Sequence, residues 1–195
     1  MRFVGLLLTI AMAWSTPSWS APRNEQPAAA RCAAMARFTW PKLVLQTVAS
    51  VPAGPLVTDG KAAGPVLPAH CMIRGVLGPR TGAQGQSLGI GFELRLPIVW
   101  NGRFQFQGGG GVDGTTVSAF GTLRDGVVPA LSQGAAVVTS NMGHTGTSTR
   151  DATFGLDLQA RIDWGYNAMD KVTVLAKDVV TRFYGKAPAY SYYVG

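Results

Sequence analysis

The stretch Tyr190-Ser191-Tyr192-Tyr193-Val194-Gly195, the last in the chain, decides the fold. Its aromatic and β-branched residues predict a short buried strand that stops at a glycine. Before it, from about Leu158 to Tyr184, apolar residues recur on one face of a helix and charged residues on the other. Gly185 suits the position after the last helical turn, and Pro188 prevents the helix from continuing. A long helix therefore leads into the final strand.

Four consecutive glycines, Gly108 to Gly111, follow a predicted strand over Arg103–Gln107. Glycine in place of alanine costs roughly 0.5–1 kcal/mol per residue, so the loop must need positive φ angles or the close approach of another group. The Lys-Ser/Thr ending of a phosphate-binding loop is absent, because Val112-Asp113-Gly114 follows. Bare amide N–H groups at the end of a strand can instead point at developing negative charge, which favours an oxyanion-binding loop.

The order of these elements predicts an α/β fold. A short helix is expected over Val128–Gln133 and a buried strand over Ala135–Thr139. Strand, glycine loop, helix and strand in succession imply a parallel sheet with right-handed crossovers. His144 follows at the carboxyl end of the second strand, where α/β folds place ligand sites. It is either a general base or a histidine that bonds the loop backbone, and we favour the second because no serine or carboxylate completes a catalytic arrangement around it.

The first half of the chain predicts antiparallel strands. Strands are expected over Leu43–Val48, Met72–Leu77 and Leu88–Leu96, the last two joined by a turn at residues 78–82. Apolar and polar residues alternate along the third strand, which predicts one buried and one wet face. Prolines and glycines between Ser50 and His70 predict an irregular surface excursion.

The N-terminus predicts export. Arg2 precedes an apolar run from Phe3 to Trp14 and then small residues, as in a secretory signal peptide over residues 1–20 that is cleaved before Ala21. The run is too short to span a bilayer core of about 30 Å. Residues 21–40 are expected to form an arm, flexible up to about residue 30.

The chain has only two cysteines, Cys32 and Cys71, and in an oxidising compartment each has a single possible intrachain partner. A disulfide is therefore predicted. A metal site that uses both cysteines and His70 would lack the usual spacing and a fourth ligand, so no metal is expected.

Composition indicates one globular domain, placed over residues 41–195. Of the 195 residues, 47% are apolar and 14% are charged. The formal charge is +7, but the basic residues are scattered singly, without the run or stripe of a nucleic-acid or membrane-surface protein. A small-molecule partner is expected; the oligomeric state is left open.

In order and spacing, several motifs resemble the N-terminal part of the tannase and feruloyl esterase family of α/β-hydrolases, which includes bacterial enzymes that hydrolyse mono(2-hydroxyethyl) terephthalate. Apart from the first forty residues, the resemblance covers nearly the whole chain. Its motifs are Leu67-Pro68-Ala69-His70-Cys71, Trp100-Asn101-Gly102-Arg103-Phe104, Gln107 to Gly111, Ala135 to His144, Phe154 to Asp157, Ala160 to Tyr166, Phe183-Tyr184-Gly185 and Ser191 to Gly195.

The resemblance implies a role for each glycine of the site. Gly108 would donate a backbone N–H to an oxyanion hole, and Gly109 would keep the approach to it narrow. Gly195 would begin a Gly-x-Ser-x-Gly nucleophile turn, with the serine just after it. The distant Asp and His of a triad, and a lid domain that often holds a structural calcium, would also lie beyond Gly195. The fold expected for this chain is thus part of an α/β-hydrolase, with a mostly parallel sheet and antiparallel N-terminal strands.

The activity implied is that of a secreted or periplasmic serine carboxylic ester hydrolase acting on esters of aromatic acids, such as feruloyl, galloyl or terephthalate-like esters, through an acyl-enzyme. The chain by itself, without the nucleophile, is expected to be inactive and to need no cofactor. The alternative is an inactive truncated product, or a non-catalytic binding module whose glycine loop holds an anion.

Overall fold

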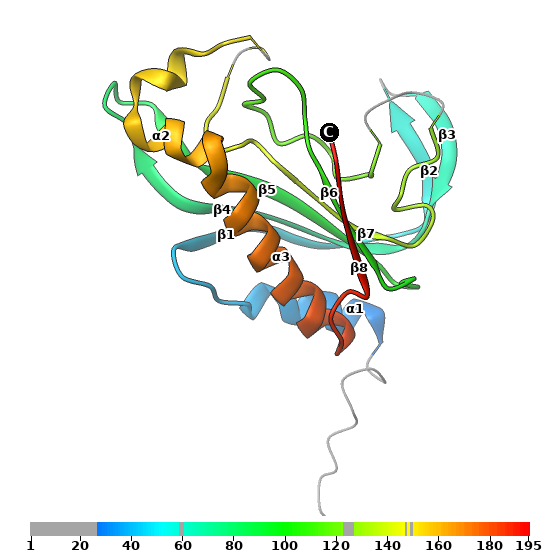
Figure 1. Ribbon diagram of the computed structural model, residues 1–195. Coiled ribbons are helices and arrows are strands. Elements are labelled where there is room, and N and C mark those ends of the chain that lie inside the picture. The colour runs from blue at the N-terminus through cyan, green and yellow to red at the C-terminus, as the bar shows by residue number, and fades with distance from the viewer. Residues whose placement is uncertain (1–26, 59–60, 123–126, 147, 149) are drawn as a thin grey trace, which may run out of the picture.

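The computed structural model describes residues 27–58, 61–122, 127–146, 148 and 150–195. The expected signal peptide lies outside the described residues. A six-stranded sheet in the order β1-β4-β5-β7-β6-β8 forms the body of the molecule (Figure 1). Its strands are β1 (Leu43–Val51), β4 (His70–Thr81), β5 (Ser87–Pro97), β6 (Arg103–Gln107), β7 (Ala136–Ser140) and β8 (Tyr190–Val194).

The sheet changes from antiparallel to parallel along its width. Strands β1, β4, β5 and β7 pair antiparallel in that order, and β6 pairs parallel with both β7 and β8. Phe104 at the start of β6 lies between Ala136 and Ser191. The antiparallel N-terminal strands and the parallel C-terminal strands are both confirmed. Because antiparallel pairing continues as far as β7, the sheet of the described residues is mixed rather than mostly parallel.

One long helical segment crosses a face of the sheet (Figure 1). It comprises α2 (Leu158–Ile162), one π-helical turn, η4 (Asp163–Asn167), and α3 (Ala168–Tyr184), after a short 3-10 helix, η3 (Thr153–Leu156). The apolar face of α3 is buried in the main core, which also contains Phe92 and Phe104 of the sheet. Gly185 ends α3 in the left-handed conformation at φ 76°, as its place in the sequence predicts. None of the helices described is long and apolar enough to cross a membrane.

The N-terminal arm is ordered earlier than expected. Helix α1 (Ala28–Ala34) begins inside the segment predicted to be flexible up to about residue 30, and the 3-10 turn η2 (Met35–Arg37) follows it. The reason is the predicted disulfide, which is confirmed: Cys32 bonds Cys71 at the start of β4, with Cα atoms 5.4 Å apart. Cys32 and Met35 are buried in the main core, so the bond and the packing hold α1 against the sheet.

The excursion predicted between Ser50 and His70 is a hairpin instead. Strands β2 (Gly54–Thr58) and β3 (Lys61–Leu67) pair antiparallel, with a register shift after Pro55. Proline has no N–H to donate to a neighbouring strand. In a two-stranded ribbon one edge of each strand has no neighbour, so a proline whose nitrogen faces that edge costs no inter-strand hydrogen bond. Leu56 and Leu67 pack with the second core cluster, which includes Val137 of β7.

Strand β5 is buried on both faces, so the predicted wet face is wrong. One face packs in the main core, and the other carries Glu93 and Arg95, which are 0% and 8% exposed. The expected turn at residues 78–82 is also wrong, because β4 continues through a bulge to Thr81 and the turn follows at Gly82.

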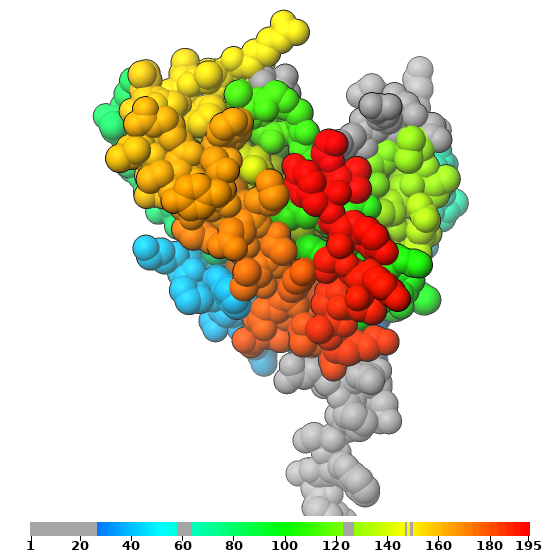
Figure 2. Space-filling model, viewed as in Figure 1, coloured from blue at the N-terminus to red at the C-terminus, as the bar shows by residue number. Residues whose placement is uncertain are grey.

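Two other expectations fail near the parallel strands. Residues 128–133 form turns, not a helix, with the Gln133 amide donating to Pro129 and Ala130. Strand β8 exists but is exposed along its whole length rather than buried. It lies at the edge of the sheet beside β6, and Figure 2 shows it, in red, at the surface of the molecule.

Candidate active site

Three segments that are distant in the sequence meet at one edge of the sheet. Because β7, β6 and β8 are parallel neighbours, their carboxyl ends lie side by side. The glycine loop, residues 108–111, follows the central strand; residues 141–144 follow β7, and Gly195 follows β8. Figure 1 shows the C-terminus beside the end of β6. The edge thus collects the residues that the sequence singled out, apart from the two cysteines.

Gly108 fastens the glycine loop to β8. Its backbone N–H donates to the Val194 carbonyl at 2.7 Å, continuing the pairing of β6 with β8. A Cβ atom at Gly108 would overlap the Tyr193 hydroxyl, and one at Gly195 would lie 2.8 Å from the same oxygen. Both glycines thus lie close to the end of the Tyr193 side chain, which is exposed and would have to move if either position carried a Cβ atom. The amide expected to face an oxyanion is already used by the sheet.

The next residues of the loop surround a carboxylate. A Cβ atom at Gly109 would overlap the Asp113 carboxyl group, and the Asp113 amide donates to the Gly110 carbonyl at 3.2 Å. Burial raises the pKa of the Asp113 carboxyl above its ordinary value, although a hydrogen bond from the Gly110 amide opposes the shift. Asp113 also has a left-handed backbone, at φ 59°. One amide of the loop, that of Gly110, thus donates to a carboxyl oxygen, although burial of the site disfavours the charged form of the carboxyl group.

His144 lies beneath this loop. It is fully buried, its ring stacks on Phe154 at 3.7 Å between centroids, and a Cβ atom at Gly114 would lie 3.0 Å from Nε2. Neither ring nitrogen has a hydrogen-bond partner within the described part of the chain. Burial lowers the pKa of the imidazole, although the Met142 backbone and Asp151 oppose the shift, so the ring is neutral at neutral pH. The ring therefore stacks on Phe154 and lies beside the loop backbone at Met142, as expected, but without a well-formed hydrogen bond to it.

Polar side chains on the sheet hold the segment that follows the glycine loop. Strands β5, β6 and β7 each contribute one such residue, and sequence reasoning missed all three. The contacts run from the Ala119 amide to Glu93 (3.0 Å), from the Gly121 amide to Gln107 (2.6 Å) and from the Thr139 hydroxyl to the Val117 carbonyl (2.6 Å). The signal available was a Glu-x-Arg pair in β5, opposite Arg74 in β4.

Glu93 is the centre of a buried charge network. It accepts hydrogen bonds from Arg95 Nε and Arg74 Nε, each at 2.6 Å, and Arg95 Nη1 reaches His70 Nε2 at 2.8 Å. Burial opposes the charged carboxylate, but the Ala119 amide and the two guanidinium groups outweigh it and lower its pKa. The Arg95 guanidinium also covers the Phe120 ring, 4.5 Å from its centroid. The network thus fixes residues 119–120 on the sheet.

Metal ligands are not gathered at this edge. In the ranges that the structure describes, no three His, Cys, Asp or Glu side chains are grouped so that they could hold a metal ion. What the edge does bring together is the glycine loop, with the Gly110 amide bonded to the Asp113 carboxyl group, and Gly195 at the end of β8.

Comparisons with known proteins agree with this geometry. The family model described as tannase and feruloyl esterase matches residues 71–195. The chain is 39% identical over 165 residues to mono(2-hydroxyethyl) terephthalate hydrolase from Piscinibacter sakaiensis, which covers 81% of this chain and 27% of that protein. It is 37% identical over 103 residues to a probable feruloyl esterase B-2 from Aspergillus flavus, covering 53% of this chain and 18% of that protein.

The crystal structure of feruloyl esterase B from Aspergillus oryzae has a similar fold, with a TM-score of 0.66 and 25% identity over 87% of this chain and 32% of that one. The chain therefore spans about a third or less of these relatives. Within that span its mixed sheet is part of an α/β-hydrolase fold. Since the family model matches more than half of its residues, the chain belongs to the tannase and feruloyl esterase family.

Proposed function

We propose that this chain supplies the oxyanion loop and the strand before the nucleophile in a serine carboxylic ester hydrolase that acts on esters of aromatic acids. The observation that carries the proposal is the meeting of the glycine loop with Gly195 at the carboxyl edge of β6 and β8. In the family pattern a serine follows this glycine within Gly-x-Ser-x-Gly. That serine would then stand close to the glycine loop, since Gly108 and Gly195 both lie against the Tyr193 hydroxyl.

The chemistry follows from these positions. The serine attacks the ester carbonyl, a histidine takes its proton, and the tetrahedral oxyanion forms beside the glycine loop. The alcohol leaves, and water then releases the aromatic acid from the acyl-enzyme. Because the Gly108 amide is bonded to Val194, we assign the oxyanion donor to the Gly109 amide, which has no acceptor among the described residues. Gly108 then has a positioning role.

Paired glycine variants test the assignment in the protein whose chain continues into Gly-x-Ser-x-Gly. In Gly109→Ala, the new methyl group overlaps the Asp113 carboxyl group and displaces the loop. We expect kcat/KM for methyl ferulate or mono(2-hydroxyethyl) terephthalate to fall by about 10²-fold, the loss typical of one oxyanion donor. Gly110→Ala is the control, because a Cβ atom there meets nothing within 4 Å. Equal losses in the two variants would contradict the assignment.

A chain that stopped at Gly195 would lack the serine of the family pattern, and we expect it to have no esterase activity. The coding sequence beyond the Gly195 codon and the intact mass of the secreted protein test this. A frame that continues into Cys-Ser-x-Gly-Gly supports the esterase. A stop codon after Gly195 with a matching mass would instead make this chain an inactive product or an anion-binding module.

Export is the second part of the proposal. It is supported by the apolar segment that follows Arg2 and by the Cys32–Cys71 disulfide, which requires an oxidising compartment. The mature protein is expected to begin at Ala21. N-terminal sequencing of protein recovered outside the cytoplasm tests this, and an intact Met1 there would contradict it.

A further inference from the structure

A second cavity lies away from the glycine loop, between the turn that precedes β1 and the helical segment at η4. We call it the Trp40 pocket. Its volume is about 530 Å³, within the range of roughly 300–1,000 Å³ that is usual for small-molecule sites. Apolar side chains form one wall and charged or amide side chains the other. The lining residues are Trp40, Pro41, Leu77 and Ile90, with Lys42, Arg80, Gln159, Asp163 and Lys171.

The one carboxylate in this lining is fully engaged. Asp163, in the π-helical turn, is buried and pairs with Arg80 Nη1 at 2.9 Å. Its other oxygen accepts hydrogen bonds from Gln159 Nε2 at 2.9 Å and Asn167 Nδ2 at 3.1 Å. Three donors, one of them charged, neutralise its effect on the cavity. The pocket is thus unsuited to a cation.

Positive charge in the pocket is not balanced. Lys42 and Lys171 are exposed, and neither side-chain ammonium group has an ion-pair or hydrogen-bond partner among the residues described. Arg80 is paired with Asp163 and also with Asp157, 3.5 Å from Nη2, so these two carboxylates balance its charge. An anion in the pocket would therefore be attracted by the two lysines.

The backbone at Lys42 also indicates function. Lys42 has a left-handed conformation, at φ 58°, which glycine or asparagine would adopt at lower cost. The Gly78 amide fixes it by donating to the Lys42 carbonyl at 2.8 Å. The other two non-glycine residues described with positive φ are Asp113 and Met142, both at the candidate active site. Strain of this kind collects at ligand sites.

We propose that the Trp40 pocket binds a small aromatic carboxylate. The two lysines would attract the carboxylate group. The Trp40 ring, with Leu77 and Ile90, would pack against the aromatic ring of the ligand. A bare phosphate would leave that wall without a partner. Asp163 packs directly against Gly143, three residues after β7, so a bound ligand would lie behind the loop that leads to the candidate active site.

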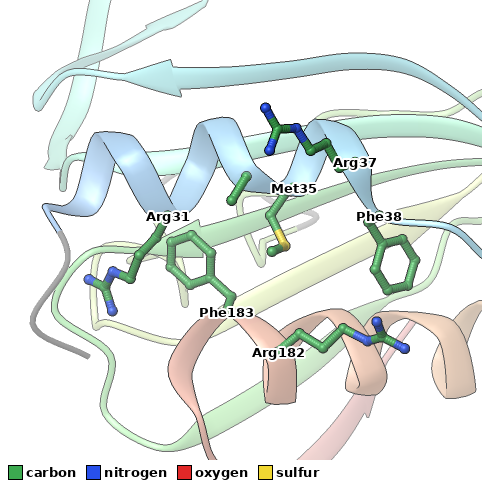
Figure 3. Close-up of a pocket in the computed structure, with 7 residues that line it drawn as sticks. Arg31, Met35, Arg37, Phe38, Arg182 and Phe183 are labelled. Atoms are coloured by element: carbon green, nitrogen blue, oxygen red, sulfur yellow. The ribbon is translucent and has the colours of Figure 1, made fainter. Parts of the chain in front are cut away.

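A second groove lined by cationic side chains differs from the Trp40 pocket, because its charged groups do not point toward one position. It lies between α1 and the end of α3 and is lined by Arg31, Arg37 and Arg182. Figure 3 shows their guanidinium groups pointing in different directions. Arg31 covers the Phe183 ring at 5.1 Å and Arg182 covers Phe38 at 5.0 Å. Two of the three arginines thus cover aromatic rings, and the three guanidinium groups do not converge on one ligand, so no site is assigned there.

Benzoate is the probe for the Trp40 pocket, and the readout is the Trp40 indole N–H signal in NMR spectra of the ¹⁵N-labelled full chain, assigned with Trp40→Phe. We expect benzoate to shift this signal saturably. Benzamide, which has the same shape without the charge, and phosphate, which has charge without a ring, should each bind at least about tenfold more weakly, a difference of about 1.4 kcal/mol.

Charge variants test the lysines. Lys42→Gly, which also suits the left-handed backbone, and Lys171→Gln, on an exposed helix surface, should each weaken benzoate binding by about fivefold to tenfold. The matched control is Lys177→Gln, which removes the same charge from the same helix outside the pocket. We expect it to stay within about twofold of the wild type.

Several outcomes would overturn the proposal: a shift that does not saturate, equal binding of benzamide, phosphate binding as strong as that of benzoate, or an effect of Lys177→Gln as large as that of Lys171→Gln. The acid released in the proposed ester hydrolysis is of the same chemical class, and only that connection rests on the proposed function. Benzoate binding is measured without turnover, so a failed esterase assay would leave this result unaffected.

Discussion

Replacing Glu93 by glutamine should destabilise this fold more than its small change in size suggests. The Glu93 carboxylate is fully buried and accepts hydrogen bonds from Arg95, Arg74 and the Ala119 amide at 2.6, 2.6 and 3.0 Å. Glu93→Gln leaves the Arg95 guanidinium, itself 8% exposed, without a counter-charge. Breaking one side of a buried pair typically costs about 3–5 kcal/mol. Domains of this size are stable by only about 5–15 kcal/mol.

A surface pair provides the matched control. Asp178 and Arg182 lie one helical turn apart on α3, joined at 3.0 Å, with side chains 31% and 50% exposed. Asp178→Asn makes the same carboxylate-to-amide change in solvent, where such pairs contribute about 0–1 kcal/mol. Urea unfolding followed by circular dichroism gives both free energies, provided that the slope with urea stays the same in each variant.

The result depends on an uncompensated charge, so removing that charge should restore stability. Glu93→Met combined with Arg95→Met is expected to be more stable than Glu93→Met alone, since the pair is replaced by apolar side chains of similar length. Similar losses in Glu93→Gln and Asp178→Asn, or no recovery in the double variant, would refute the reasoning.

Three further predictions concern the same fold. Replacing Cys32 and Cys71 by serine opens a link of sequence separation 39 and should lower the free energy of unfolding by about 4 kcal/mol in urea titrations, on the chain-entropy account; an unchanged midpoint would contradict it. Burial lowers the pKa of His70 below its ordinary 6.5, although the hydrogen bond to the Pro68 carbonyl opposes the shift. As the pH falls, the unfolded chain therefore binds a proton before the folded chain does, and the free energy of unfolding should decrease below about pH 6.5. Burial keeps His144 neutral in the same way, so the urea midpoint should become independent of pH below 6.5 only when both histidines are replaced. A urea midpoint that does not change with pH in the wild type would contradict this prediction. Finally, His144→Leu should change the free energy of unfolding by less than about 1 kcal/mol, because a buried imidazole without partners gains little from its nitrogens, whereas a loss of several kcal/mol would reveal a hydrogen bond that this geometry lacks.

The sequence predicted correctly those elements that depend on residues close together in the chain. Helix α3 has a regular apolar face and a glycine cap, and β6 ends where four glycines begin, so both were predictable. The pairing of β4 with β5 followed from their proximity in the chain. The disulfide followed from the number of cysteines alone.

Features that depend on distant contacts were not predictable in this way. Glu93 and Arg95 on the second face of β5 predict that this face is exposed to solvent. Residues 119–120, about twenty-five positions later in the chain, pack over it instead. The β2–β3 hairpin was hidden by its prolines, which a two-stranded ribbon tolerates on its edges. The exposure of β8 follows from its place at the sheet edge, which no local pattern encodes.

The buried polar residues connect the stability of the sheet with the chemistry proposed at its edge. An oxyanion site works only if its amides are held in place before charge develops, because moving them during the reaction would consume the energy gained. Four consecutive glycines cannot hold themselves in place. The segment that continues the loop is instead fixed by Glu93, Gln107 and Thr139, one residue from each of three adjacent strands. The sheet residues of this chain therefore fix residues 117–121, the segment to which the glycine loop leads, independently of whichever residues supply the nucleophile.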